Sequence, residues 1–386
     1  MNTARRAAEI QPFEVMDVLS RAHALESAGR HVVHMEIGEP DFTAPEPVVE
    51  AGVRALRDGR TAYTATLGLP ALREAIAAHY ASRFRASVPA GRVVVTSGAS
   101  GGLLTVAALY FDAGDEVLVP DPGYPGYRHF VRAFEGRARA LAVGPAQNFQ
   151  PTLAMVRAAW GSRTKGLVLG SPSNPTGTLI ARVELEAIAR FIAERGGVLI
   201  VDEIYQGLSY GLDPWTAYGL PGDVVIVNSF SKYFCMTGWR LGWVVLPAAA
   251  VRGFEKLAQH LFISAPAVAQ YAACAAFTAE SINTLEERRH EFARRRDFLL
   301  PVLKDAGLRV PAEPHGAFYV YADCGRDARG YCMQLLENEA VAATPGMDFG
   351  ANGTDRYVRF AYTRAMADLE EAARRIKRFA ASSPDA

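Results

Sequence analysis

A lysine, two hydroxyls and an arginine follow one apolar run of the sequence. Ser229, Ser231 and Lys232 come directly after the run that ends near Asn228, and Arg240 lies one short segment further on. A lysine amine can attack an aldehyde, while hydroxyl groups and a guanidinium can bind a phosphate. This set matches the needs of pyridoxal phosphate: Lys232 would form the Schiff base, and the other groups would hold the phosphate.

An acidic residue ends a second apolar run, Val198–Asp202. The pyridine nitrogen of the cofactor must stay protonated to act as an electron sink, and a buried carboxylate can pair with it. Asp202 fits this role. The alternative interpretation is an aspartate that caps the N-terminus of a helix.

A loop rich in proline carries one amide side chain, Asn174. Pro172, Pro175 and Gly177 surround it, directly after a predicted strand that ends at Gly170. Ligands of open α/β sheets bind at this edge, so Asn174 can contact both the ring hydroxyl of the cofactor and a substrate carboxylate. An Asn-Pro turn without function is the alternative.

The turn Thr96–Gly102 contains small residues between a predicted strand and a helix. Free N–H groups at such a helix N-terminus can bind an anion. The turn also matches the G-x-S-x-G nucleophile elbow, which predicts a rival serine hydrolase using Ser100, Asp202 and one of three histidines, His260, His290 or His315. The rival lacks an upstream HGGG loop and leaves the lysine, the arginine and the Asn-Pro loop without a role.

Eight motifs in order resemble the class I/II, fold-type I pyridoxal phosphate-dependent aminotransferases over roughly residues 10–380. They are Ile37–Phe42, Tyr63, Asp121–Pro125, Asn174–Gly177, Asp202 with Tyr205, Ser229 with Lys232, Gly238–Arg240, and Arg359.

The resemblance implies roles around the cofactor. Lys232 would also move the proton between the substrate α-carbon and the cofactor C4′. Asn174 and Tyr205 would bond the ring hydroxyl, and Tyr124 would stack on the ring. The phosphate would be bound by Ala99 and Ser100 through backbone N–H groups, with Ser229, Ser231 and Arg240.

The resemblance also implies a homodimer and a substrate clamp. Tyr63 would reach the phosphate of the neighbouring subunit. Arg359 would bind the substrate α-carboxylate, with help from Gly38 and Asn174. Without the family, the alternating strand around Arg359 would place its side chain on the surface. The sequence departs from the family at Asp348, where small residues are usual, and an acid there puts acidic substrates in doubt.

The implied reaction moves an amino group between an L-amino acid and a 2-oxo acid by a ping-pong mechanism. A β-eliminating carbon–sulfur lyase is the alternative, because the same carbanion can expel a β-substituent. Motifs around the cofactor do not separate the two.

Short β-branched runs alternate with helical patterns, which predicts an α/β fold with a mostly parallel, seven-stranded sheet covered by helices. We expect a large cofactor-binding domain at 48–280 and a smaller α+β domain formed by 1–47 and 281–386. The predicted strands of the sheet are Arg92–Thr96, Glu116–Val119, Ala138–Val143, Gly166–Gly170, Val198–Asp202, Val224–Asn228 and Leu241–Leu246.

Helical periodicity is clearest at Ala181–Arg195, where Val183 is among the residues predicted to face the core. Further helices are predicted at Glu14–Ala28, Ser281–Ala306, Ala328–Glu339 and Ala365–Ala381. Additional strands are predicted at His31–Ile37, Ala317–Tyr321 and Tyr357–Ala361.

Composition excludes several classes of protein. The 386 residues carry 41 Lys+Arg and 41 Asp+Glu, and 50% are apolar, which argues against disorder and against a nucleic-acid or lipid partner. No apolar run matches a signal peptide or a membrane span. His31 and His34 lack metal-ligand spacing, so we expect no metal site. The four cysteines fit no disulfide framework, so we expect a cytoplasmic protein.

Overall fold

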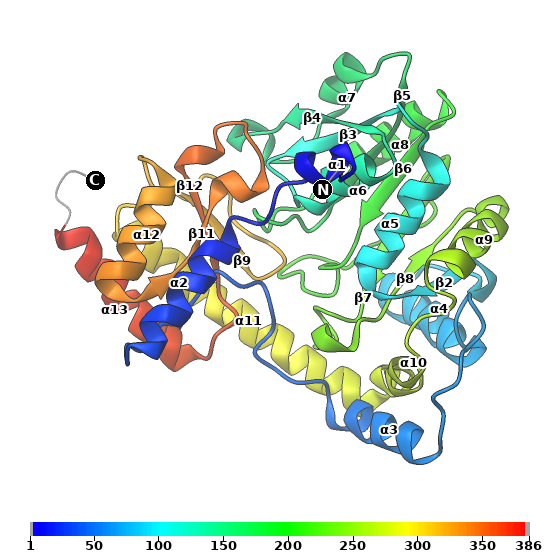
Figure 1. The fold of residues 1–386 in the computed structure, drawn as a ribbon, viewed down its shortest axis with the longest axis horizontal. Helices are drawn as coiled ribbons and strands as arrows, with labels where there is room; N and C mark the ends of the chain where they lie inside the picture. The colour runs from blue at the N-terminus through cyan, green and yellow to red at the C-terminus, as the bar shows by residue number, and fades with distance from the viewer. Residues whose placement is uncertain (1–2, 383–386) are drawn as a thin grey trace.

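The computed structural model describes residues 3–382, and within that range seven strands form one central sheet (Figure 1). Its order is β2-β8-β7-β6-β5-β3-β4, and all neighbours are parallel except the two pairs made by β8. This confirms the predicted α/β fold, with each strand found within two residues of its expected bounds. The strands are β2 Val93–Thr96, β3 Glu116–Asp121, β4 Arg137–Ala142, β5 Thr164–Gly170, β6 Val198–Asp202, β7 Asp223–Ser229 and β8 Gly242–Val245.

The sheet is buried on both faces because its apolar strands send alternate side chains to opposite sides. Leu167 and Leu169 of β5 enter one core, while Val168 enters the other. Helices α5 (Gly98–Tyr110), α6 (Gly126–Ala133) and α9 (Val251–Leu261) cover the Val168 face. The opposite core includes side chains of α4 (Pro70–Phe84), α7 (Leu153–Ala159), α8 (Arg182–Ala193) and α10 (Ala267–Cys274), with α3 (Glu46–Arg57) packed on α10.

The N-terminal and C-terminal parts of the chain form a second group of helices and strands beside the sheet (Figure 1). The long helix α11 (Ala279–Asp305) connects this group to the sheet. Strand β1 (Val33–His34) pairs in parallel with β10 (Val341–Ala342), and β12 (Tyr357–Ala361) lies between β11 (Thr344–Pro345) and β9 (Tyr319–Asp323). The helices here are α1 (Arg5–Glu9), α2 (Val15–Ser27), α12 (Ala328–Glu339) and α13 (Met366–Ser382). The domain boundaries at 47/48 and 280/281 stay a prediction.

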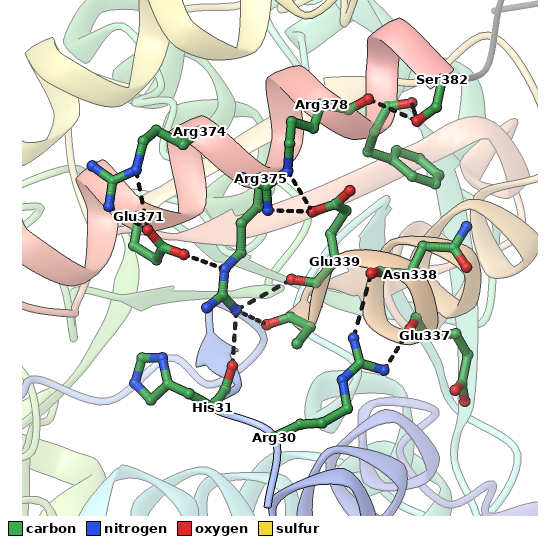
Figure 2. A network of polar contacts seen from close by, with 12 residues as sticks. Arg30, His31, Glu337, Asn338, Glu339, Glu371, Arg374, Arg375, Arg378 and Ser382 are labelled. Atoms are coloured by element: carbon green, nitrogen blue, oxygen red, sulfur yellow. Dashed lines mark hydrogen bonds and ion pairs between the residues drawn. The ribbon is translucent and has the colours of Figure 1, made fainter.

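A network of arginines fastens the N-terminal segment to α12 and α13 (Figure 2). Arg375 donates to the carbonyl oxygens of His31 at 2.8 Å and Ala340 at 3.2 Å. Arg30 donates to the carbonyl oxygen of Glu337 at 2.6 Å. These bonds satisfy carbonyl groups at the C-terminal end of α12, where the helix itself provides no donors. They hold the chain in place for the pairing of β1 with β10.

Two local predictions were wrong. Val183 is 81% exposed, because it lies in the first turn of α8 on the side opposite the buried Leu185. The strand predicted over 31–37 shortens to β1, whose partner β10 is itself two residues long. The strand predicted near 317–321 is present as β9, shifted by two residues, since Ala317 has a φ of 57°, which is incompatible with an extended strand.

No helix among residues 3–382 combines the length and the apolar character needed to cross a bilayer. The four cysteines carry free thiols.

Candidate active site

The carboxyl ends of the parallel strands meet at one edge of the sheet, above which lies a cavity of about 320 Å³. That size suits a small ligand. The cavity is lined by all but one of the residues that the family resemblance assigns to the site: Gly38, Ala99, Ser100, Tyr124, Asn174, Asp202, Tyr205, Ser229, Ser231, Lys232, Arg240 and Arg359. Tyr63 lies outside it and is 81% exposed.

Lys232 follows the end of β7 and turns its amine into the cavity. Its Nζ donates to the carbonyl oxygen of Gly38 at 2.5 Å. The pKa of Lys232 is lowered to about 8, chiefly by burial and also by the guanidinium groups of Arg359 and Arg240, against the attraction of Glu39. About a tenth of the amine is therefore neutral, and thus nucleophilic, at pH 7.

Asp202 ends β6 and is 4% exposed. Its Oδ2 accepts from the Tyr127 hydroxyl at 2.9 Å, and its Oδ1 accepts from the backbone N–H of Ile204 at 3.0 Å. Burial raises the pKa of Asp202 to about 6, while these two hydrogen bonds and the Lys232 charge oppose the rise. The carboxylate is thus mostly ionised at pH 7, in a place where it can pair with a buried cation.

An anion-binding corner forms where α5 begins. No side chain caps the N-terminus of α5, so the N–H groups of its first turn, at Ala99 and Ser100, are not taken by a capping group. Gly98 has a φ of 73°, and a Cβ there would lie 2.9 Å from Arg240 Nη2, so only glycine lets the arginine approach the helix end.

Two serine hydroxyls complete this corner. Ser229 Oγ donates toward Ser231 Oγ at 3.0 Å and the carbonyl oxygen of Leu241 at 3.1 Å. Both serines are buried at the strand end.

Three aromatic side chains form one wall of the cavity. Tyr124 is half-buried, and burial raises its pKa to about 12. Tyr205 and Tyr319 share a hydrogen bond of 2.7 Å between their hydroxyl oxygens. Tyr319 also explains Gly38, because a Cβ at that position would overlap the Tyr319 hydroxyl.

Arg359 is 6% exposed, so the surface position suggested by strand alternation alone was wrong. Its Nη1 donates to Asn174 Oδ1 at 2.9 Å, and its Nη2 donates to the carbonyl oxygen of Glu36 at 2.5 Å. The guanidinium lies 4.3 Å from the centre of the Tyr319 ring and 4.8 Å from that of Phe349. Its buried Nε has no hydrogen-bond partner among the described residues, which leaves a donor for a carboxylate.

These groups fit pyridoxal phosphate. An uncapped helix end with an arginine and two hydroxyls suits the phosphate, a buried carboxylate suits the pyridinium, and the Lys232 amine lines the same cavity. The rival hydrolase does not fit. Ser100 lines the cavity, but none of its proposed partners His260, His290 and His315 does.

Sequence reasoning missed Tyr127 and Tyr319. Both line the cavity, where their hydroxyl groups form hydrogen bonds with Asp202 and Tyr205, respectively. Tyr127 comes from α6 and Tyr319 from β9, both far along the chain from their partners. It also missed Phe13 and Val15, which line the cavity from the N-terminal segment. The only sequence signal for these residues was their aromatic or apolar type, which core positions share.

Known proteins resemble this chain along nearly its whole length. Residues 30–376 match the sequence model of the family described as aminotransferase class I and II. A valine–pyruvate aminotransferase of Mycobacterium tuberculosis is 40% identical over 96% of both chains. A (5-formylfuran-3-yl)methyl phosphate transaminase of Methanocaldococcus jannaschii is 38% identical over 97% of this chain and 99% of that protein.

A crystal structure of an aminotransferase from Mycobacterium tuberculosis superimposes with a TM-score of 0.95 at 39% identity, covering 99% of this chain and 100% of the other. Agreement at this level extends to the fold and to the whole length of the chain. The protein therefore belongs to the class I and II aminotransferases, and it is a pyridoxal phosphate-dependent transaminase.

Proposed function

We propose that this enzyme transfers an amino group between an L-amino acid and a 2-oxo acid in a ping-pong cycle, with the roles given below. The observation that carries the proposal is the convergence of three charged groups on one cavity: the amine of Lys232, the carboxylate of Asp202 and the guanidinium of Arg359. Amino-group transfer needs an amine nucleophile, a carboxylate that pairs with the ring nitrogen of the cofactor, and a cation that binds the substrate carboxylate.

Bound pyridoxal phosphate supplies an electron sink that stabilises negative charge on the substrate α-carbon. Asp202 would pair with its ring nitrogen, and Asn174 and Tyr205 would bond its ring hydroxyl. Tyr124 would lie against the ring face. The anion-binding corner would hold the phosphate through Ala99, Ser100, Ser229, Ser231 and Arg240.

Lys232 moves the proton. Because burial lowers its pKa to about 8, its neutral amine is available to accept the proton of the substrate α-carbon. The carbonyl oxygen of Gly38 accepts from Nζ at 2.5 Å and fixes the position of the amine in the cavity.

Arg359 would bind the α-carboxylate of either substrate. Asn174 and the Glu36 carbonyl orient its two terminal nitrogens, and Tyr319 covers one face of the guanidinium. Orientation by fixed partners reduces the entropy that substrate binding would otherwise cost.

We also propose a homodimer in the cytoplasm. An aromatic side chain that is 81% exposed, as Tyr63 is, suits a position covered by a second subunit, where it would reach the neighbouring phosphate. The free thiols suit a reducing compartment. Sedimentation equilibrium measures the subunit number, and a monomer that is fully active would contradict the shared site.

Replacement of Lys232 by Ala tests the function. The variant is expected to lose turnover and the visible absorbance of the cofactor-loaded wild type, since within residues 3–382 no other lysine lines the cavity. Lys256→Ala, on the exposed side of α9, is the matched control and should match the wild type. Transamination by Lys232→Ala at the wild-type rate would end the proposal. Release of pyruvate and ammonia from cystathionine without an oxo-acid acceptor would replace it with a lyase.

A further inference from the structure

The N-terminal segment crosses the mouth of the cavity. Phe13 and Val15 contribute to the cavity wall beside Phe349 and Asp348. Phe13 is 44% exposed, so part of its ring is buried against the protein and part stays accessible. The segment therefore belongs to the site, although none of its residues is needed to bind the cofactor.

Both ends of this segment are attached to different parts of the molecule. On one side, α1 lies against α6, where Glu9 pairs with Arg132 (Figure 1). On the other side, Arg21 of α2 pairs with Glu337 of α12. Between these attachments, the bond that ties the segment to the cavity wall runs from the backbone N–H of Glu14 to Asp348 Oδ1, at 3.0 Å.

Asp348 is itself held firmly. Its carboxylate is 5% exposed, and its backbone carbonyl accepts from Arg128 Nη2 at 3.2 Å. The neighbouring carbonyl of Phe349 accepts from the backbone N–H of Gly123 at 2.9 Å. Burial raises the pKa of Asp348, while the hydrogen bond from the Glu14 N–H and the positive charges of Arg359 and Arg128 oppose the rise.

Charges around the cavity indicate which substrate side chains fit. Among the described residues, the cations on the wall are Lys232, Arg240 and Arg359, and each already has a role. Three further candidates for a positive charge, Arg21, Arg128 and His260, do not line the cavity. A second substrate carboxylate would instead meet the buried charge of Asp348, close to the Phe349 ring that packs on Arg359.

We propose that Asp348 clasps the Phe13–Val15 segment over the cavity, and that the apolar wall formed in this way selects substrates with neutral, apolar side chains. Asp348 is a positioning residue, because it acts through the segment and not on the reacting atoms. The proposal rests on the proposed function, since it assumes that Arg359 holds the α-carboxylate. It extends that function from amino acids in general to a class of side chain.

Half-reactions of the cofactor-loaded enzyme test the selectivity. The change in cofactor absorbance is followed with L-leucine, L-valine and L-aspartate as single substrates. We expect kcat/KM for the apolar donors to exceed that for aspartate at least about tenfold. Equal or better reaction with aspartate would overturn the proposed selectivity. That result would be expected if a second subunit supplied a cation for the aspartate side chain. A wild type that reacts with no amino acid would mean that the proposed function itself has failed.

Variants test the clasp. Asp348→Ala should raise KM for L-leucine about tenfold with a smaller effect on kcat. Asp348→Asn should be intermediate, since its amide oxygen can still accept from the Glu14 N–H. Phe13→Ala should raise KM in the same way. Asp327→Asn is the matched control: it alters an exposed aspartate that accepts from the backbone N–H groups of Arg329 and Gly330.

Proteolysis gives a readout that does not depend on activity. A glutamyl endopeptidase should cleave after Glu14 about tenfold faster in Asp348→Ala than in the wild type or in Asp327→Asn, with Val15 as the new N-terminus. Unchanged cleavage together with an unchanged KM would overturn the clasp. Because this measurement needs no substrate, it tests the clasp even if transamination fails.

Discussion

Asp202 depends on a neighbour that is not itself in contact with the reacting groups. Tyr127 donates to its Oδ2, and the backbone N–H of Ile204 donates to its Oδ1. Two donors keep a carboxylate ionised in a place where burial alone favours the protonated acid. The ionisation of Asp202 at the end of β6 therefore depends on a side chain from α6.

Tyr127→Phe removes one of these donors. The pKa of Asp202, about 6 in the wild type, should rise, because only the Ile204 N–H and the Lys232 charge remain to favour the anion. The acid limb of the activity profile should therefore move to higher pH, and loss of a hydrogen bond worth about 1.5–3 kcal/mol should lower activity at pH 7 by about two- to tenfold.

The measurement is kcat/KM from pH 5 to 9. Tyr110→Phe serves as the control, since the Tyr110 hydroxyl has no partner among the described residues. An acid limb that stays in place in Tyr127→Phe would show that this hydroxyl does not tune Asp202.

Single residues were predictable where the local sequence dictated their position. Lys232 and Asp202 follow apolar runs, so their places at strand ends could be read directly. Tyr127 and Tyr319 could not be predicted, because their partners lie 75 and 114 positions away along the chain. Contacts over such distances depend on the order of the strands, which periodicity does not encode.

At the scale of elements, the junction of β2 and α5 is shaped by one glycine. Gly98 turns the chain through a positive φ and leaves space for Arg240 at the helix end. Arg240 reaches this place because β8, which follows it, runs antiparallel between β7 and β2.

Gly98→Ala should weaken cofactor binding about tenfold, since a Cβ at 2.9 Å displaces Arg240 and the backbone strain costs about 1–2 kcal/mol. A titration of the cofactor-free protein with pyridoxal phosphate measures this. Gly101→Ala is the matched control, because its nearest neighbour would be at 3.4 Å and alanine favours a helix interior. Equal affinity in the two variants would contradict the steric argument.

The elements themselves were largely predictable, for a physical reason that also explains the failures. A short run of continuously apolar residues is typical of a strand that is buried on both faces of a sheet. The bounds of β6 were therefore predicted to the residue. The short β1 failed because two residues of ladder leave almost no periodic signal. The prediction that Val183 faces the core was wrong because an apolar residue in the first turn of a helix can lie on either face of that helix.

Across the whole molecule, one buried acid makes stability depend on pH. Glu203 is 2% exposed and accepts from Thr216 Oγ1 and from the backbone N–H of Ala217. The pKa of Glu203 is raised to about 7, chiefly by burial and to a smaller extent by Asp202, while the hydrogen bonds from Ala217 and Thr216 oppose the rise. The folded state therefore keeps a proton that the unfolded state releases near its ordinary pKa.

The free energy of unfolding should decrease as pH rises from about 4.5 to 7, with this group contributing about 3 kcal/mol of the loss. Glu203→Gln should remove that contribution and leave a flatter profile. Urea unfolding at pH 5 and pH 8 gives the comparison, with the exposed Glu50→Gln as the control. Identical slopes for the wild type and Glu203→Gln would refute the assignment.

The bond between Arg359 and Glu36 joins residues 323 positions apart. During synthesis, the strand ends that surround Lys232 leave the ribosome well before β12 does. At a translation rate of roughly 10 residues per second, β12 follows β8 by about 10 s. All seven strands of the central sheet are thus synthesised before the corner that grips a substrate carboxylate can form. The order of translation makes that corner a late addition to a sheet whose strands already exist.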